Sequence, residues 1–144
     1  MIPSRITVAT LGAYDMPVLR AFYRGLGWQE VAGASDAFAS FRTGGCILAL
    51  FPFRHLAKDA RVPASDIGTA FRGVTLALNV ERGDLVDDAI AELRAAGATI
   101  TKEPEDAPWG GRSAYFADPE GNVWEVVWAP GAFDDAGEFV WNVQ

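Results

Sequence analysis

The sequence predicts an α+β fold built from two βαβββ modules. A rhythm of short apolar runs around one amphipathic segment occupies residues 1–53, and the same rhythm returns in residues 73–128. In both copies a glycine, Gly27 or Gly97, follows the amphipathic segment, as is typical where a helix ends. We therefore expect a single domain in four parts: a first module (1–53), a connector (54–72), a second module (73–128) and a C-terminal arm (129–144).

The first module is predicted to contain one helix among four strands. Residues 5–13 read RITVATLGA, an alternation that predicts the first strand. Asp15 is expected to cap the helix that follows, with Pro17 in its first turn. The apolar stripe of this helix is expected to consist of Val18, Leu19, Phe22 and Leu26. Three apolar runs then predict three strands, at Trp28–Val31, Phe38–Thr43 and Cys46–Phe53.

The second module is predicted to repeat this order after a connector that mixes charge, proline and glycine. In the connector we expect at most one helical turn, near Leu56–Ala60. The helix of the second module is expected to be capped by Asp84, with an apolar face of Val86, Ala89, Ile90 and Leu93. Its strands are expected at Val74–Val80, Ala98–Lys102, Arg112–Ala117 and Val123–Trp128. The remaining segments are predicted to be irregular: a loop at Glu103–Gly111 with Trp109 at its tip, and an arm carrying Phe133, Phe139 and Trp141.

Composition narrows the classes of partner. No apolar run reaches the length of a membrane span and the first residues lack a signal-peptide pattern, so we expect a cytoplasmic protein with no membrane partner. A net charge of −7 and a pI near 4.6 argue against nucleic acid, which selects for clustered Lys and Arg. With one cysteine, Cys46, and one histidine, His55, the chain offers neither an internal disulfide nor a zinc-type cluster.

The most unusual stretch is DPEGNVWEVVW, from Asp118 to Trp128. A turn signal runs directly into a strand rich in β-branched and aromatic residues, yet Glu125 lies in its middle. Because side chains alternate along a strand, Glu125 shares a face with Val123 and Val127, while the tryptophans point to the other face. A carboxylate on an inward face requires a metal, a cation or hydrogen-bond donors. Glu125 is therefore the leading candidate for a functional residue.

Several ordered motifs resemble the vicinal-oxygen-chelate superfamily, which includes glyoxalase I, bleomycin-resistance proteins and extradiol dioxygenases. They are AFYRGLGW (Ala21–Trp28), AELRAAGATI (Ala91–Ile100) and YFADPEGNVWEVVW (Tyr115–Trp128), placed on the duplicated rhythm. The resemblance implies two modules whose curved mixed sheets enclose a central cavity, the glyoxalase/bleomycin-resistance-like fold. It also implies a homodimer, as in many relatives, and it leaves catalysis and plain binding both open.

Metal-dependent members of that superfamily hold an ion with four ligands, commonly two histidines, or a histidine and a glutamine, and two glutamates. Carried over to this sequence, the four positions fall on Val8, Ala49, either Thr75 or Leu78, and Glu125. One carboxylate of four remains, and a single carboxylate binds Mg²⁺ or Mn²⁺ only weakly. We therefore expect neither the usual metal nor any other cofactor.

The resemblance and the alternation together leave a cup lined by apolar and aromatic groups around one carboxylate. Its expected lining is Val8, Thr10, Phe41, Ala49, Phe51, Thr75, Ala77, Tyr115 and Val127, with Trp109 able to close over it. Such a cup suits a flat aromatic ligand whose cationic or hydrogen-donating group pairs with Glu125. The leading hypothesis is a metal-independent protein that binds a small, antibiotic-like molecule, as bleomycin-resistance proteins do.

Glu125 has two further interpretations. As a structural carboxylate it would be satisfied by Arg42, Arg112, a hydroxyl or buried water. As a general base it would serve a glyoxalase-like lyase or isomerase, with Tyr115 or Thr75 donating to a developing oxyanion. This metal-free enzyme ranks below the binding hypothesis, and a metal-dependent lyase or dioxygenase ranks below both of these functions.

Three other residues have ordinary structural explanations beside functional ones. Trp109 suits packing on its own loop as well as contact with a ligand. His55 suits a surface position in the connector better than the role of a catalytic base. Cys46 suits a small apolar residue at a strand start better than a nucleophile, because the sequence places no base or helix N-terminus beside it.

Overall fold

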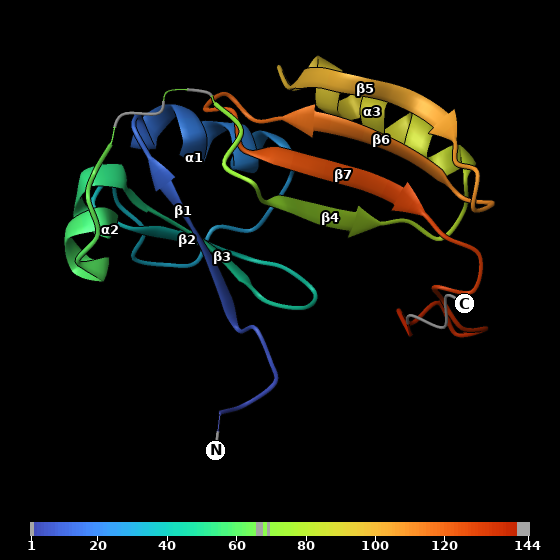
Figure 1. Ribbon diagram of the computed structural model, residues 1–144, viewed down its shortest axis with the longest axis horizontal. Helices are drawn as coiled ribbons and strands as arrows, with labels where there is room; N and C mark the ends of the chain where they lie inside the picture. The colour runs from blue at the N-terminus through green and yellow to red at the C-terminus, as the bar shows by residue number, and fades with distance from the viewer. Residues whose placement is uncertain (1, 66–67, 69, 141–144) are drawn as a thin grey trace. The chain divides into compact units, whose positions relative to one another are not determined.

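The computed structural model describes residues 2–65, 68 and 70–140, and it divides into two compact units, Met1–Thr69 (unit 1) and Ala70–Gln144 (unit 2). Among the described residues each unit has one curved sheet, with seven strands and three helices in all, which confirms the predicted α+β fold class (Figure 1). In chain order they are β1 (Val8–Ala13), α1 (Met16–Gly25), β2 (Ala39–Arg42), β3 (Ile47–Pro52), α2 (Phe53–Ala60), β4 (Thr75–Asn79), α3 (Asp84–Ala95), β5 (Thr99–Asp106), β6 (Arg112–Ala117) and β7 (Val123–Trp128). Within these ranges every helix is too short or too polar to cross a lipid bilayer.

Unit 1 pairs its strands in the order β1-β3-β2, with β1 parallel and β2 antiparallel to β3. Helix α1 covers one face of this sheet, which we call the helix face. There Leu48 and Leu50 are buried, and the rings of Phe41 and Tyr23 lie 5.8 Å apart. The opposite face is called the open face. Burial of this apolar set on one side is what holds α1 to the sheet.

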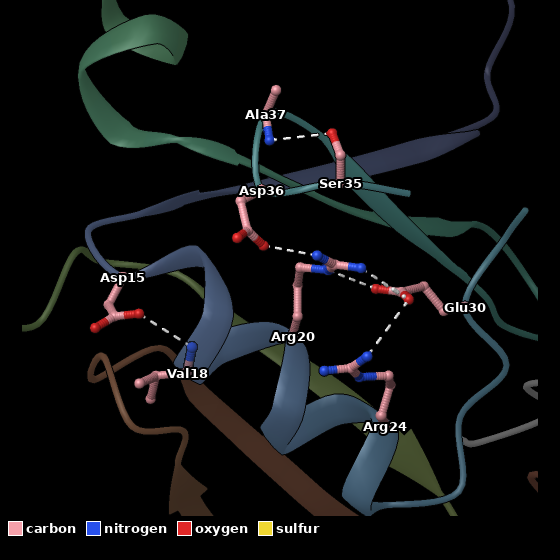
Figure 2. Close-up of polar contacts among 8 residues, drawn as sticks. All are labelled: Asp15, Val18, Arg20, Arg24, Glu30, Ser35, Asp36 and Ala37. Carbon is pink, nitrogen blue, oxygen red and sulfur yellow. Dashed lines mark hydrogen bonds and ion pairs between the residues drawn. The ribbon is translucent and has the colours of Figure 1, made fainter. Parts of the chain in front are cut away.

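Helix α1 begins as predicted but buries a different stripe. Asp15 is the N-cap, and its side chain accepts a hydrogen bond from the backbone N–H of Val18 at 3.1 Å (Figure 2). The prediction that Val18 lies in the apolar stripe is wrong, because its side chain is 45% exposed. The buried stripe is Met16, Leu19, Phe22 and Tyr23. It has helical spacing and begins two residues before Val18.

The strand predicted at Trp28–Val31 forms only a short stretch of pairing. Its backbone makes two hydrogen bonds with β2, Val31 N–H to Ser40 O at 2.8 Å and Arg42 N–H to Gln29 O at 3.0 Å. An ion pair between Arg20 and Glu30 holds this segment in place instead. The guanidinium of Arg20, on α1, donates to both carboxylate oxygens of Glu30 at 2.8 and 3.1 Å and to Asp36 at 2.6 Å (Figure 2). Both side chains of the Arg20–Glu30 pair are mostly buried, so a charge-assisted bidentate contact holds this segment to α1.

The connector contains a full helix rather than a single turn. Helix α2 spans Phe53–Ala60 and ends at Arg61, whose φ of 56° is left-handed. The N–H of Val62 then reaches the carbonyl of Ala57 at 3.0 Å, which is the helix-ending motif that usually employs glycine. The helix packs at one end of the open face of unit 1, where Gly12 is required because a Cβ there would lie 2.9 Å from the Phe53 ring.

Unit 2 follows the predicted order β4, α3, β5, β6, β7, with its strands arranged β4-β7-β6-β5. Helix α3 lies along one face of this sheet (Figure 1). The residues that it helps to bury include Val86 and Ile90 on the helix and Val126 on the sheet, and the stacked rings of Phe116 and Trp124 lie on the same side with centroids 6.2 Å apart. Trp124 thus belongs to the core, as alternation predicts.

The capping of α3 differs from the prediction. Gly83 is the N-cap and makes no side-chain cap bond, while Asp84 is the first helical residue and pairs with Arg82 at 3.0 Å. The helix is tied to the sheet by Arg112 of β6, which donates two hydrogen bonds to Asp87 at 2.7 and 2.8 Å and one to Asp106 at 2.9 Å. These acidic partners raise the pKa of Arg112, and Arg112 in turn lowers the pKa of Asp87.

Strand β5 is longer than predicted and the arm is more ordered. The prediction of a loop beginning at Glu103 is wrong, because β5 continues to Asp106. In the arm, Phe133 and Phe139 form a β-bridge with their rings 5.6 Å apart. Trp141, the third aromatic residue predicted there, lies outside the described residues.

Candidate functional site

The open face of unit 2 presents side chains in rows that run across the strands. In the central row Glu125 on β7 pairs with Ala77 on β4 and with Tyr115 on β6, and Tyr115 pairs with Lys102 on β5. Paired residues in neighbouring strands point to the same side of a sheet, so these four side chains share one face. The next row along the strands is Asn79, Val127, Ser113 and Glu105.

Tyr115 is the neighbour of Glu125 in this row, and both side chains are half-buried. Burial raises the pKa of Tyr115, and its interaction with the Glu125 carboxylate raises the pKa further. The hydroxyl therefore stays protonated at neutral pH. Of the two arginines considered as partners of Glu125, Arg112 is directed instead to two aspartates on the helix side.

Lys102 completes the polar set. Its ammonium donates to the Ser113 hydroxyl at 3.1 Å, forms an ion pair with Glu105 at 3.1 Å and lies 5.6 Å from the centre of the Tyr115 ring. Ser113 is only 3% exposed, so this contact satisfies a buried hydroxyl. The cation over the ring restrains Tyr115 at the same time. Lys102, Tyr115 and Glu125 thus form a continuous chain of contacts across three strands.

The position of Lys102 depends on an irregularity in β5. Ile100 pairs with Phe116 on the helix face, and simple alternation would put Lys102 on that face too. The register shifts between Ile100 and Lys102, so that Lys102 pairs with Tyr115 instead. A second shift follows before Glu105. An extra residue in one strand re-aims the side chains after it, which is how a charged residue reaches this face.

The other predicted site residues of unit 2 on regular strands lie on the same face as Glu125. Thr75 and Ala77 are exposed, and Val127 is buried beside them. The two candidates for the third ligand position are now distinguished, because Thr75 pairs with Val123 on the open face while Leu78 pairs with Val126 on the helix face. Thr75 is the only one of the two that shares a face with Glu125.

In unit 1, four of the five predicted site residues share the open face. Thr10 pairs with Ala49, and Val8 and Phe51 occupy the equivalent face two residues away along their strands. Val8 and Thr10 are exposed, whereas Ala49 is buried. The ring of Phe51 is 6.0 Å from Phe38 and 6.0 Å from His55 on α2, so aromatic groups cover one end of this face.

The placement of Phe41 among these residues is wrong. In the β2–β3 pairing Phe41 lies opposite Leu48, not Ala49, and its ring is fully buried against Tyr23 on the helix face. Ser40 takes the place expected for Phe41, since it pairs with Ala49. The register between two strands is fixed by their pairing, and an offset of one residue reverses which side chains face the core.

Trp109 lies against its own loop. Its indole approaches Gly111 so closely that a Cβ on that residue would be 1.9 Å from the ring, and only glycine accommodates this contact. The indole is nevertheless 54% exposed. The packing interpretation therefore describes one face of the ring, and the other face is available to a ligand.

The residues that the sequence comparison carries to the superfamily's four ligand positions do not supply the donors of a divalent metal site. In unit 1, Val8 and Ala49 carry no side-chain donor atom. In unit 2, Thr75 offers a neutral hydroxyl and Glu125 a single carboxylate. Across residues 2–65, 68 and 70–140, no group of three or more His, Cys, Asp or Glu side chains is arranged to hold a metal ion.

Sequence reasoning missed Asn79, Lys102 and Ser113. Alternation carried two residues beyond Ala77 and two before Tyr115 would have found Asn79 and Ser113. No such signal exists for Lys102, because its face is set by the register shift in β5.

Comparison with known proteins agrees with this architecture. The sequence profile of the Glyoxalase/Bleomycin resistance protein/Dioxygenase superfamily matches residues 5–126. No curated protein matches the chain in sequence.

Three solved structures illustrate the similarity. A glyoxalase-related enzyme from Fulvimarina pelagi is 26% identical, with a TM-score of 0.82 over 96% of this chain and 99% of its own. A glyoxalase/bleomycin resistance protein/dioxygenase from Nocardioides is 28% identical, with a TM-score of 0.77 over 97% and 92% of the two chains. A lactoylglutathione lyase from Agrobacterium tumefaciens is 25% identical, with a TM-score of 0.69 over 89% and 96%.

Proposed function

The chain belongs to the Glyoxalase/Bleomycin resistance protein/Dioxygenase superfamily, and from that premise we propose that it binds an aromatic or cationic small molecule without a metal ion. Glu125 is the group that recognises the ligand's positive or hydrogen-donating end. The observation that carries this proposal is the row of side chains across the open face of unit 2. In this row Lys102 lies over the Tyr115 ring, and Tyr115 lies beside Glu125.

The chemistry of that row favours binding over metal catalysis. Tyr115 is the neighbour that interacts with Glu125, and a carboxylate has about four lone-pair sites, so Glu125 retains acceptor capacity for a ligand. Exposed Thr75 and Ala77 leave the side of Glu125 toward β4 unobstructed by large side chains. Val127, Trp109 and the ring of Tyr115 supply apolar surface for a flat ligand. In unit 1, taken by itself, Val8, Thr10, Ala49 and Phe51 are proposed as a second ligand-contacting surface.

A matched pair of probes tests the role of the charge. Benzamidine and benzamide have the same flat shape, but only benzamidine is cationic. We expect benzamidine to raise the thermal midpoint of the protein and benzamide to raise it less, because only the cation pairs with Glu125. In Glu125→Gln that difference should disappear. Glu138→Gln, which removes an exposed carboxylate of the arm, is the matched control. Equal responses to both probes in the wild-type protein would refute recognition by charge.

A second candidate is a metal-free lyase or isomerase in which Glu125 is the general base. It is favoured by the position of Tyr115 beside Glu125, because a protonated hydroxyl there could donate to a developing oxyanion. The names of two of the similar structures, a glyoxalase-related enzyme and a lactoylglutathione lyase, favour it as well. The test is turnover of 2-oxoaldehyde hemithioacetals by protein treated with a chelator. Loss of about 10²–10⁴-fold in rate is expected for Glu125→Gln. No turnover, or turnover unaffected by this substitution, would eliminate the candidate.

We also propose that two copies of the chain associate. Strand β4 lies at the edge of the unit 2 sheet, and Phe71 and Val74 just before it are 65% and 63% exposed. Exposed apolar residues beside a sheet edge favour association. Light scattering should then give twice the chain mass of 15.5 kDa, and a value equal to one chain contradicts the proposal.

A further inference from the structure

Asn79 carries a polar atom whose partner is missing within the described part of the chain. Its side-chain oxygen is buried, and no donor among those residues lies within hydrogen-bonding distance. Buried side-chain acceptors are nearly always paired, because an unpaired one has lost its bonds to water without replacement. The amide oxygen therefore either destabilises the fold or has a partner outside the described residues, a bound water or a ligand.

The position of Asn79 relates it to Glu125. Asn79 is the last residue of β4 and pairs with Val127, so its side chain leaves the sheet on the open face. Its strand neighbour two residues earlier, Ala77, is the partner of Glu125. From the rise along a strand and the spacing between strands, the Cα atoms of Asn79 and Glu125 are about 8 Å apart. That separation is spanned by one small aromatic ring with a substituent at each end.

The two residues offer complementary acceptors. Glu125 is an anionic acceptor beside Tyr115, and Asn79 contributes a neutral acceptor. Ala77, beside Glu125, has a small side chain, and no other β4 side chain lies between Ala77 and Asn79 on this face. A flat ligand could therefore lie close to the sheet there. The terminal torsion of an Asn side chain is soft, so its oxygen can turn toward a ligand without a change of backbone. The remaining donor of the set, Lys102, is on the far side of Tyr115 and is already bonded to Ser113 and Glu105.

We infer that Asn79 determines ligand specificity by accepting a hydrogen bond from a second, uncharged donor on a flat aromatic ligand whose cationic end is held by Glu125. This inference rests on the proposed binding function and narrows it to aromatic molecules with a cation at one end and an N–H or O–H donor at the other. A ligand that lacks the second donor leaves the amide oxygen unpaired and binds more weakly.

Two probes differ by that donor alone. Benzamidine has only the cationic amidine, whereas para-aminobenzamidine adds an amino group at the opposite end of the ring. By isothermal titration calorimetry we expect para-aminobenzamidine to bind the wild-type protein about tenfold more tightly, the size of one added hydrogen bond in a desolvated site. In Asn79→Leu this advantage should vanish while the affinity for benzamidine is retained. In Glu125→Gln both probes should weaken together. Thr101→Val, which replaces an exposed polar side chain of β5, is the control for a polar-to-apolar change on the same sheet.

The stability of the unliganded protein gives a second, independent readout. Leucine has nearly the shape of asparagine and no acceptor, so Asn79→Leu should raise the thermal midpoint if the oxygen is unpaired without ligand. A lowered midpoint would show that the amide has a structural partner, such as a bound water, and would overturn the inference. Equal affinity of the two probes for the wild-type protein, with both dependent on Glu125, would overturn the role of Asn79 and leave the proposed function intact. Failure of both probes to bind would reject the proposed function in this ligand class and the inference with it.

Discussion

The open face of the unit 1 sheet is mostly apolar, whereas that of unit 2 carries a connected set of polar side chains. In unit 1 the face presents Val8, Ala49 and Phe51, with hydroxyls at Thr10 and Ser40 near its middle and the guanidinium of Arg42 at the end of β2. In unit 2 the corresponding face presents the chain of contacts from Lys102 through Tyr115 to Glu125, with Asn79 in the next row. Two modules of the same secondary-structure rhythm have therefore taken different chemical roles.

On their helix faces the two units are alike. Each buries a large aromatic residue beneath its helix, Phe41 in unit 1 and Phe116 in unit 2. Each also has an arginine that joins helix and neighbouring segments through two carboxylates, Arg20 with Glu30 and Asp36, and Arg112 with Asp87 and Asp106. The similar helix faces maintain the fold, and the difference between the open faces supports the proposal that unit 2 recognises the ligand.

The largest expected effect tests the likeness of the helix faces. Phe41→Ala and Phe116→Ala should each lower the free energy of unfolding by about 3–5 kcal/mol, because each removes a fully buried ring and leaves a cavity. Thr10→Ala, at an exposed position of the open face, should change it by no more than about 0.5 kcal/mol. Urea unfolding of the three variants is the measurement. If Phe41→Ala were as mild as Thr10→Ala, Phe41 would belong to the open face after all.

The arginine contacts should differ in strength between the units. Arg20→Met is expected to cost about 1–3 kcal/mol, because Arg20 and Glu30 are 14% and 16% exposed in their side chains. The substitution removes both hydrogen bonds to Glu30 and leaves it the longer contact with Arg24, at 4.0 Å. Arg112→Met should cost less, since Asp87 and Asp106 are 50% and 86% exposed and water can replace the lost bonds. Urea unfolding near neutral pH measures both, and a larger loss for Arg112→Met would contradict this order.

The Arg20–Glu30 ion pair predicts a difference in acid sensitivity between the wild-type protein and Arg20→Met. The hydrogen bond from Arg20 lowers the pKa of Glu30 below its value in the unfolded chain. A carboxyl with a lowered pKa stabilises the folded state fully above the unfolded-state pKa, and this contribution is lost as the pH falls through the lowered value. Wild-type protein should therefore lose stability over that acid range more steeply than Arg20→Met. Parallel profiles of unfolding free energy against pH would show that the pair has no linked titration.

A smaller effect concerns the polar chain of unit 2. Burial, and then Glu125, raise the pKa of Tyr115, so the stability that goes with the neutral hydroxyl is present below the ordinary tyrosine pKa and is lost as the pH rises through the raised one. Glu125→Gln should shift the ionisation of Tyr115 to lower pH, because a negative charge and its hydrogen bond are removed while burial remains. Near-ultraviolet absorbance follows the titration, and Tyr115→Phe identifies its signal among the three tyrosines. An unchanged titration in Glu125→Gln would mean that the two side chains are not in contact.

The smallest effect is expected for the cation over the ring. A double-mutant cycle between Lys102→Met and Tyr115→Leu should give a coupling free energy of about 0.5–1 kcal/mol, the usual size of a partly exposed cation–π contact. The pairing of Lys102 with Glu105 should add little, because the Glu105 side chain is 66% exposed. Additive effects of the two substitutions would remove Lys102 from the chain of contacts.

The wrong sequence-based predictions all rest on local patterns, which do not fix how an element packs or pairs. For Val18 and Asp84 the local helix pattern is displaced by one or two residues: the buried stripe begins at Met16, and the N-cap is Gly83. Phe41 was assigned to the face of Ala49 from a pattern that holds along one strand but says nothing of how two strands pair. Lys102 was missed because a register shift within β5 breaks the alternation on which the assignment relied.

The sequence by itself determined the order of most helices and strands, the α+β class and the face on which Glu125 lies, because hydrophobic period and turn residues are local properties. Only the tertiary structure decided that Tyr115 lies beside Glu125, that Lys102 contacts the Tyr115 ring, and that the oxygen of Asn79 is buried without a donor among the described residues. These contacts depend on inter-strand register and bulges, which arise from the pairing of segments far apart in the chain and leave no mark in either segment alone.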